Sequence, residues 1–170
     1  MKKIALFAAI LLFAGASFAQ RFAYIDSDYI MENIPEYKAA EQELERISVV
    51  WQNEIEQSFS EIDRMYREYQ AEAPLLPEEM RRQREETIIE RERVAKEMQM
   101  QRFGREGDLF KKRQELIKPI QDKVFEAIEE IATRGNYAVI FDKSGGITMI
   151  FTDVRYDLSD EVLQRLGYRR

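Results

Sequence analysis

Hydrophobic residues recur every three or four positions between residues 36 and 73, in a stretch without glycine or proline. The apolar positions are Tyr37, Ala40, Leu44, Ile47, Trp51, Ile55, Phe59, Ile62, Tyr66, Tyr69 and Ala73. This spacing predicts one long helix with a single apolar stripe, and three consecutive steps of four around Trp51 form a stutter in the repeat. At about 1.5 Å per residue the helix spans about 57 Å, so we expect it to project from any compact body.

The sequence Pro-Leu-Leu-Pro at 74–77 interrupts this pattern, and a second helical stretch follows it. That stretch begins with Glu78 and Glu79, which suit a helix N-terminus, and ends near Gly135, a favourable C-cap. Its apolar positions are Met80, Ile88, Val94, Met98, Phe110, Ile117, Val124, Ile128 and Ile131. Residues 36–73 carry 10 acidic and 4 basic side chains, whereas residues 78–118 carry 10 acidic and 12 basic ones. Opposite net charges favour an antiparallel helical hairpin with its tip at 74–77.

Glycines at 104 and 107 lie in a polar part of the second limb, where the apolar stripe thins. Each glycine costs roughly 1 kcal/mol in a helix relative to alanine, which favours a soft point in the limb. A close approach of two helices at small residues explains the same glycines equally well. Pro119 is a second candidate for a bend.

Three short apolar stretches, 22–26, 137–142 and 147–152, predict β-strands. The last two flank Lys143-Ser-Gly-Gly and predict a β-hairpin. Both of its strands are apolar at successive positions, so both faces of the sheet need to be covered. One chain offers little to cover them, and free strand edges invite pairing with other chains, so we expect an obligate oligomer with these strands at its core.

Two short helices complete the prediction. Asp26, Ser27 and Asp28 follow the first strand, and we interpret them as helix caps rather than metal ligands. Ser159 is the predicted cap of a final helix that ends at Gly167.

The N-terminus is typical of a secretory signal peptide, residues 1–19, with cleavage before Gln20. Lys2 and Lys3 precede an apolar run that is shorter than the roughly 20 residues of a membrane span, although an uncleaved anchor is the alternative. Loss of the two lysines changes the formal charge from −6 to −8. An acidic exported protein is a poor partner for nucleic acid.

The chain contains no cysteine and no histidine. Without cysteine the chain has no disulfide. Without histidine it lacks the commonest zinc ligand and the general base of serine and cysteine hydrolases. Neither a phosphate-binding loop nor a set of nucleophile, base and oxyanion donors can be identified. We expect no enzyme activity, no catalytic or metal site and no cofactor.

Two stretches carry a specific resemblance. They are "RFAYIDSDYIMENIPEYKAAEQELERI" after the signal peptide and "LIKPIQDKVFEAIEEIATRGNYAVIFDKSGGITMIFTDVRYDLSDEVLQRLGY" near the end, with the charged helical hairpin between them. This order resembles the Skp/OmpH family of periplasmic chaperones over the whole mature chain. The arms agree only in length, charge and periodicity.

Members of that family are homotrimers in which strands of three subunits close a β-barrel and three helical tentacles enclose an unfolded outer-membrane protein without ATP. The resemblance implies an α+β fold here, with a coiled-coil arm at 36–118 and a trimerisation body at 20–35 and 119–170. The implied trimer-interface residues are Phe22, Tyr24, Val139, Phe141, Met149 and Phe151. It also implies a periplasmic holdase chaperone for outer-membrane proteins.

Well-known family members are strongly basic, whereas this chain is acidic. The acidic charge argues against binding of lipopolysaccharide or a membrane surface, and against capture of clients by charge alone. A positive bias survives on the second limb, at Arg81, Arg82, Arg84, Arg91, Arg93, Arg102, Arg105, Lys111, Lys112 and Arg113.

Many weak apolar contacts from the arms can hold an unfolded chain without selecting one sequence. The candidate client-binding residues are Trp51, Phe59, Tyr66, Tyr69, Leu75, Leu76, Met98, Met100 and Phe103. Most of these also have to join the two limbs, and Leu75 and Leu76 at the tip are expected to be exposed. The alternative function is a structural coiled-coil scaffold or adaptor of the cell envelope.

Overall fold

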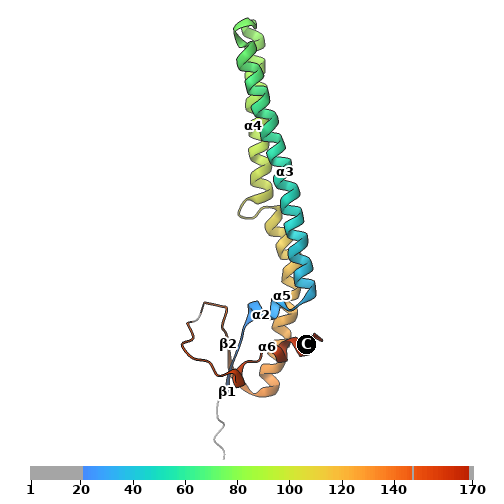
Figure 1. Ribbon diagram of the computed structural model, residues 1–170, viewed down its shortest axis with the longest axis vertical. Helices are drawn as coiled ribbons and strands as arrows, with labels where there is room; N and C mark the ends of the chain where they lie inside the picture. The colour runs from blue at the N-terminus through green and yellow to red at the C-terminus, as the bar shows by residue number, and fades with distance from the viewer. Residues whose placement is uncertain (1–20, 147, 169–170) are drawn as a thin grey trace, which may run out of the picture. The chain divides into compact units, whose positions relative to one another are not determined.

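A computed structural model describes residues 21–146 and 148–168, so the expected signal peptide lies outside the described residues. The chain divides into two compact units (Figure 1). One unit is Ile34–Asp122, and the other combines the residues before and after that range.

The long helix of the first unit is α3 (Pro35–Glu72), which confirms the helix predicted from the apolar stripe. A proline occupies its first turn, where the missing N–H has no partner within the helix in any case. The buried residues of α3 all belong to the predicted stripe and are Ala40, Leu44, Ile55 and Ile62.

A short 3-10 helix, η1 (Ala73–Leu75), ends α3, and the chain returns as α4 (Glu78–Phe103). Figure 1 shows α3 and α4 side by side, so the predicted hairpin and its tip are confirmed. The buried positions of α4 differ from the prediction, because Ile88 and Ala95 are buried whereas Val94 is 43% exposed. Ala95 follows Ile88 by seven residues, which is about two turns, so both lie on the same side of the helix. Val94 precedes Ala95 by one residue and points about 100° away from it.

The return limb is interrupted where the two glycines were predicted to weaken it. Helix α4 ends at Phe103, and α5 (Asp108–Gly135) begins after four residues and continues through Pro119. A Cβ at Gly104 would lie 2.3 Å from the Met100 carbonyl oxygen, and one at Gly107 would lie 2.8 Å from that of Gln101. The chain turning back on itself therefore requires both glycines, and the predicted soft point is confirmed as an interruption of the helix.

The second unit contains a two-stranded sheet of β1 (Arg21–Ile25) and β2 (Tyr137–Asp142). The two strands are parallel, with Phe22 opposite Val139 and Tyr24 opposite Phe141. Parallel neighbours need a long crossover connection, and here the whole helical hairpin is that connection. The first two predicted strands are thus confirmed.

The predicted β-hairpin is wrong. Residues 148–152 form no strand, and β2 pairs with β1 instead. The turn after β2 is folded towards β1, because the Lys143 N–H donates to the Ile25 carbonyl at 2.8 Å and the Ser144 hydroxyl donates to Asp26 at 3.0 Å. These long-range bonds replace the tight turn that a hairpin needs.

Two short helices, α2 (Ser27–Glu32) and α6 (Ser159–Arg165), pack together and bury Ile30, Met31, Val162 and Leu163. The predicted cap of α2 is confirmed, since Asp26 accepts a hydrogen bond from the Tyr29 N–H at 3.0 Å. Ser159 is not a cap, because it is the first residue of α6 and its own N–H donates to Asp157 at 2.9 Å.

Two of the left-handed backbone positions in this unit mark where helices end. Gly167 has φ +93° just after α6, as predicted for its end. After α5 the left-handed residue is Asn136, with φ 50°, rather than the predicted Gly135, which still belongs to the helix. Asparagine tolerates this conformation better than other residues with a Cβ.

Candidate functional site

The predicted trimer-interface residues of the two strands share one face of the sheet. Phe22 and Tyr24 are two positions apart on β1, and their partners in register, Val139 and Phe141, are two positions apart on β2. Phe22, Val139 and Phe141 are 49%, 41% and 38% exposed, whereas Tyr24 is buried. We call these four side chains the apolar sheet face.

An open cavity of about 810 Å³ adjoins the apolar sheet face. Its lining brings together five of the six predicted interface residues, Phe22, Tyr24, Phe141, Met149 and Phe151. Next to it, Ile150 is 98% and Phe151 is 84% exposed. Large apolar side chains exposed together are typical of surfaces that bind another apolar surface.

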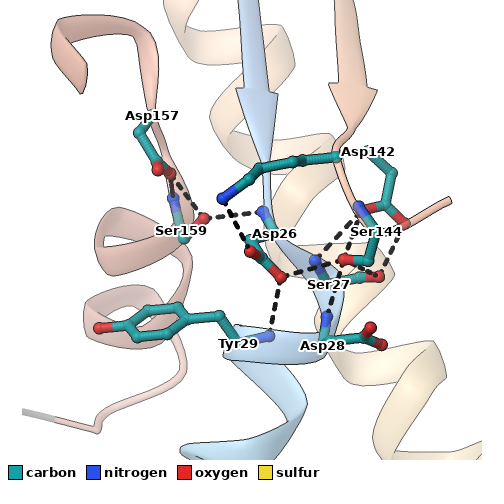
Figure 2. A network of polar contacts seen from close by, with 9 residues as sticks. Asp26, Ser27, Asp28, Tyr29, Asp142, Ser144, Asp157 and Ser159 are labelled. Atoms are coloured by element: carbon teal, nitrogen blue, oxygen red, sulfur yellow. Dashed lines mark hydrogen bonds and ion pairs between the residues drawn. The ribbon is translucent and has the colours of Figure 1, made fainter. Parts of the chain in front are cut away.

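A network of hydrogen bonds fixes the corner where β1 turns into α2 (Figure 2). The Asp142 carboxylate accepts from the Ser27 N–H at 3.1 Å and from the Ser27 hydroxyl at 2.7 Å. The Ser144 hydroxyl donates to Asp26 at 3.0 Å and accepts from the Asp28 N–H at 3.1 Å. The network therefore ties the turn after β2 to the beginning of α2.

The same corner is tied to α6 by a buried serine. The Asp26 N–H donates to the Ser159 hydroxyl oxygen at 2.9 Å, and that hydroxyl donates to Asp157 at 2.6 Å (Figure 2). Beside it, the Leu158 N–H donates to the Tyr24 carbonyl at 2.9 Å. The hydroxyl of Ser159, which is only 3% exposed, is satisfied in this way.

Both aspartates at the centre of this network have pKa values below the ordinary value. The hydrogen bond from the Tyr29 N–H lowers the pKa of Asp26, with help from Ser144 and Lys143 and against the effect of burial. Burial raises the pKa of Asp142, but the hydrogen bonds from Ser27 and Ser144 together outweigh it and lower the pKa. Both groups are ionised at neutral pH and hold neighbouring parts of the chain together.

The candidate client-binding residues on the hairpin fall into two groups. Trp51, Phe59, Tyr69, Leu76 and Met98 are half-buried. Phe59 and Tyr69 pack against the buried cluster of Ile62, Ile88 and Ala95 between the limbs. The others are exposed, with Tyr66 at 49%, Leu75 at 86%, Met100 at 68% and Phe103 at 37%. The expectation of an exposed tip is therefore confirmed for Leu75 and wrong for Leu76, which is half-buried.

Sequence reasoning missed several exposed apolar residues of the hairpin. Ile89 is 66% exposed and lies next to the buried Ile88. It shares a face of α4 with Met100, because eleven residues make about three turns of helix. Further exposed members of the hairpin are Val49, Val50, Met80, Val94 and Phe110. The seven-residue spacing of Ile88 and Ala95 is the pattern that would have revealed this face.

Other classes of site find no support in the described part of the chain. Residues 21–146 and 148–168 contain no group of three or more acidic side chains placed to hold a metal ion. None of the described helices combines the length and the apolar character needed to cross a membrane.

Comparisons with known proteins agree with this architecture. A curated relative from Aquifex aeolicus (strain VF5), described as an uncharacterized protein, is 26% identical over 166 residues, which cover 98% of this chain and 96% of the relative. The crystal structure of a candidate outer membrane chaperone (OmpH-like) from Caulobacter crescentus CB15 matches with a TM-score of 0.70 at 13% identity. That match covers 87% of this chain and 84% of the other, and it shows a shared fold.

Family membership follows from the sequence itself and confirms the resemblance noted above. Residues 21–166 match the family described as outer membrane protein (OmpH-like). This range contains all of the unit Ile34–Asp122, with the hairpin, and the part of the other unit that carries the apolar sheet face. The chain therefore belongs to the OmpH-like family.

Proposed function

We propose that this protein is an ATP-independent holdase chaperone that binds unfolded outer-membrane proteins in the periplasm and prevents their aggregation. Family membership supports a chaperone role in general terms. The structurally similar protein from Caulobacter crescentus is itself described as a candidate outer membrane chaperone.

The observation that carries the proposal is the set of exposed apolar side chains on the hairpin. Leu75, Ile89 and Met100 are 86%, 66% and 68% exposed. Each contact with a client contributes only about 25 cal/mol per Å² of apolar surface removed from water. Many such contacts hold a disordered chain without selecting one sequence, and the flexible methionine adapts to different partners.

The working form that we propose is a homotrimer. Residues 20–35 and 119–170 form the body, and residues 36–118 form the arms that surround the client. The exposed side chains next to the apolar sheet face, above all Ile150 and Phe151, support this assembly because it buries them.

Export is part of the same proposal. Residues 1–19 direct the chain to the periplasm and are removed there, and the acidic mature protein does not bind lipopolysaccharide. Since periplasmic ATP is not required, the client leaves by folding or by transfer to a partner.

The decisive test measures light scattering of a denatured outer-membrane β-barrel protein on dilution, with and without the purified mature protein. We expect aggregation to be suppressed at about one trimer per client, because multivalent binding retains the whole chain. Unchanged aggregation would exclude the holdase function. Affinity capture from envelope extracts separates the scaffold alternative, which predicts one or two folded partners in fixed ratio rather than many unfolded ones.

A further inference from the structure

The interruption of the return limb lies beside the single tryptophan of the sequence. The ring of Trp51 on α3 meets the ring of Phe103, the last residue of α4, edge to face at 6.4 Å and 83°. The guanidinium of Arg102 lies over the Trp51 ring, 4.4 Å from its centroid. Two residues at the end of α4 therefore hold one side chain of α3.

Arg102 also reaches across the break. Its guanidinium forms an ion pair at 3.0 Å with Asp108, the first residue of α5. The two side chains are 33% and 26% exposed, compared with 54% and 58% for Arg93 and Glu90 on the surface of α4. Because solvent screens exposed pairs most strongly, the pair at the break holds more firmly than those along the helix surface.

Arg102 lies on the side of α4 that packs against α3. Ile88, Ala95 and Arg102 are seven residues apart, so Arg102 continues the row that faces α3. On α3, the stutter in the apolar repeat runs from Ile47 to Phe59 and includes Trp51. The regular apolar packing of both limbs therefore changes where Trp51 faces Arg102. There the aliphatic part of the arginine and the tryptophan ring occupy the space between the limbs.

Among the four connecting residues, 104–107, only Gly107 is buried. Within it, the Gly107 N–H donates to the Gly104 carbonyl at 2.9 Å. Arg105 and Glu106 are exposed, and in the structure as described neither makes a hydrogen bond or ion pair. The attachment of the break to α3 therefore depends on Trp51 and its neighbours.

We propose that Arg102, Asp108 and Trp51 form a clasp that fixes the break of the return limb to α3. When the ion pair opens, residues 103–108 detach from α3 and uncover the ring of Trp51, which is half-buried in the closed form. The clasp thereby sets how much aromatic surface the hairpin presents at this level. The inference concerns the hairpin itself and does not depend on the chaperone function.

The experiment uses the mature full-length protein and its only tryptophan. Asp108→Asn removes the carboxylate that pairs with Arg102 at 3.0 Å and with Lys111 at 3.9 Å, and it does not touch the ring. Arg102→Met, as a separate variant, removes the cation that lies over the ring. Arg105→Met and Glu106→Gln are matched controls, because they remove one positive and one negative charge from the connection between Arg102 and Asp108, at residues without partners among those described. The readouts are acrylamide quenching of Trp51 fluorescence and hydrogen exchange of the amides at 103–108.

We expect Asp108→Asn to increase quenching and to speed exchange about two- to fivefold, with both controls like the wild type. Added salt should raise quenching in the wild type and the controls but not in Asp108→Asn, which has already lost the pair. The proposal is wrong if Asp108→Asn and Glu106→Gln show the same quenching and the same exchange rates. It is equally wrong if only Arg102→Met changes the readouts, since the cation would then act without Asp108.

Discussion

The Asp142 carboxylate accepts two hydrogen bonds from Ser27, at 3.1 Å from its backbone N–H and at 2.7 Å from its hydroxyl, although 115 residues separate the two. The end of β2 is thereby attached to the first residue of α2. The apolar sheet face depends on this attachment, since it keeps the turn after β2 on the side of β1.

Asp142→Asn should destabilise the sheet-containing unit by about 1 to 3 kcal/mol, because charged acceptors form the stronger hydrogen bonds. Asp28→Asn is the control, an exposed carboxyl close by that accepts no hydrogen bond in the described structure. Chemical denaturation followed by circular dichroism measures both. Equal stability of the two variants would contradict the assigned role of Asp142.

The pH dependence of stability follows from the same carboxylates. Asp26 and Asp142 both have a pKa below the ordinary 3.8, so they stabilise the fold above that pH. This contribution is lost as the pH falls through the lower pKa values of the folded state. Acid titrations of thermal unfolding should show a smaller loss below about pH 4 for Asp142→Asn than for the wild type. If Asp142→Asn loses stability with falling pH as steeply as the wild type, Asp142 does not contribute to the pH dependence.

Substitution of Gly104 by alanine should destabilise the hairpin by roughly 1 to 3 kcal/mol, because the new Cβ would meet the Met100 carbonyl oxygen at 2.3 Å. Gly145→Ala is the control, since its nearest contact would be an ordinary 3.4 Å to Asp142. Thermal unfolding detects the difference. Two variants with equal stability would mean that the break relaxes without cost.

Assembly is tested by placing a charge on the exposed segment that follows β2. Phe151→Asp should lower the mass of the mature protein in sedimentation equilibrium from that of a trimer, because a buried unpaired charge is costly. Phe125→Asp is the matched control, a phenylalanine that is 66% exposed and does not line the cavity. If the control dissociates and Phe151→Asp does not, the interface lies elsewhere.

Client binding is tested by removing apolar side chains that the helix packing does not need. The double variant Ile89→Ser and Met100→Ser should keep the helical content but require several-fold more protein to suppress aggregation, because weak contacts add through multivalency. Phe125→Ser, outside the hairpin, serves as the control. If the double variant suppresses aggregation as well as the wild type, clients do not bind to this face of α4.

The sequence predicts the hairpin well because its main determinants are local. Steps of three and four identify α3, and prolines and glycines identify both interruptions of the helical pattern. The rotation of α4 was harder to predict, since its apolar residues are sparse and the small Ala95 carries the contact instead of Val94. The exposure of Ile89 depends on this rotation and therefore does not follow from the apolar pattern.

The β-region was predicted only in part because its pairing is not local. Apolar residues on either side of Lys143-Ser-Gly-Gly suggested a hairpin, but Ser144 and Asp142 bond to residues that precede the long helices. No neighbouring residues reveal those partners. The exposed Ile150 and Phe151 show why the stretch looks like a strand in the sequence while it stays unpaired in a single chain.

The parallel pairing of β1 with β2 has a consequence for the order in which the chain folds. Residue 22 is paired with residue 139, so the first strand cannot find its partner until more than two thirds of the 170 residues have been made. Local contacts let the helical hairpin form early, whereas the sheet has to close a long loop at an entropic cost. The N-terminal strand therefore waits as an unpaired apolar segment, and the surface that we assign to assembly is completed last.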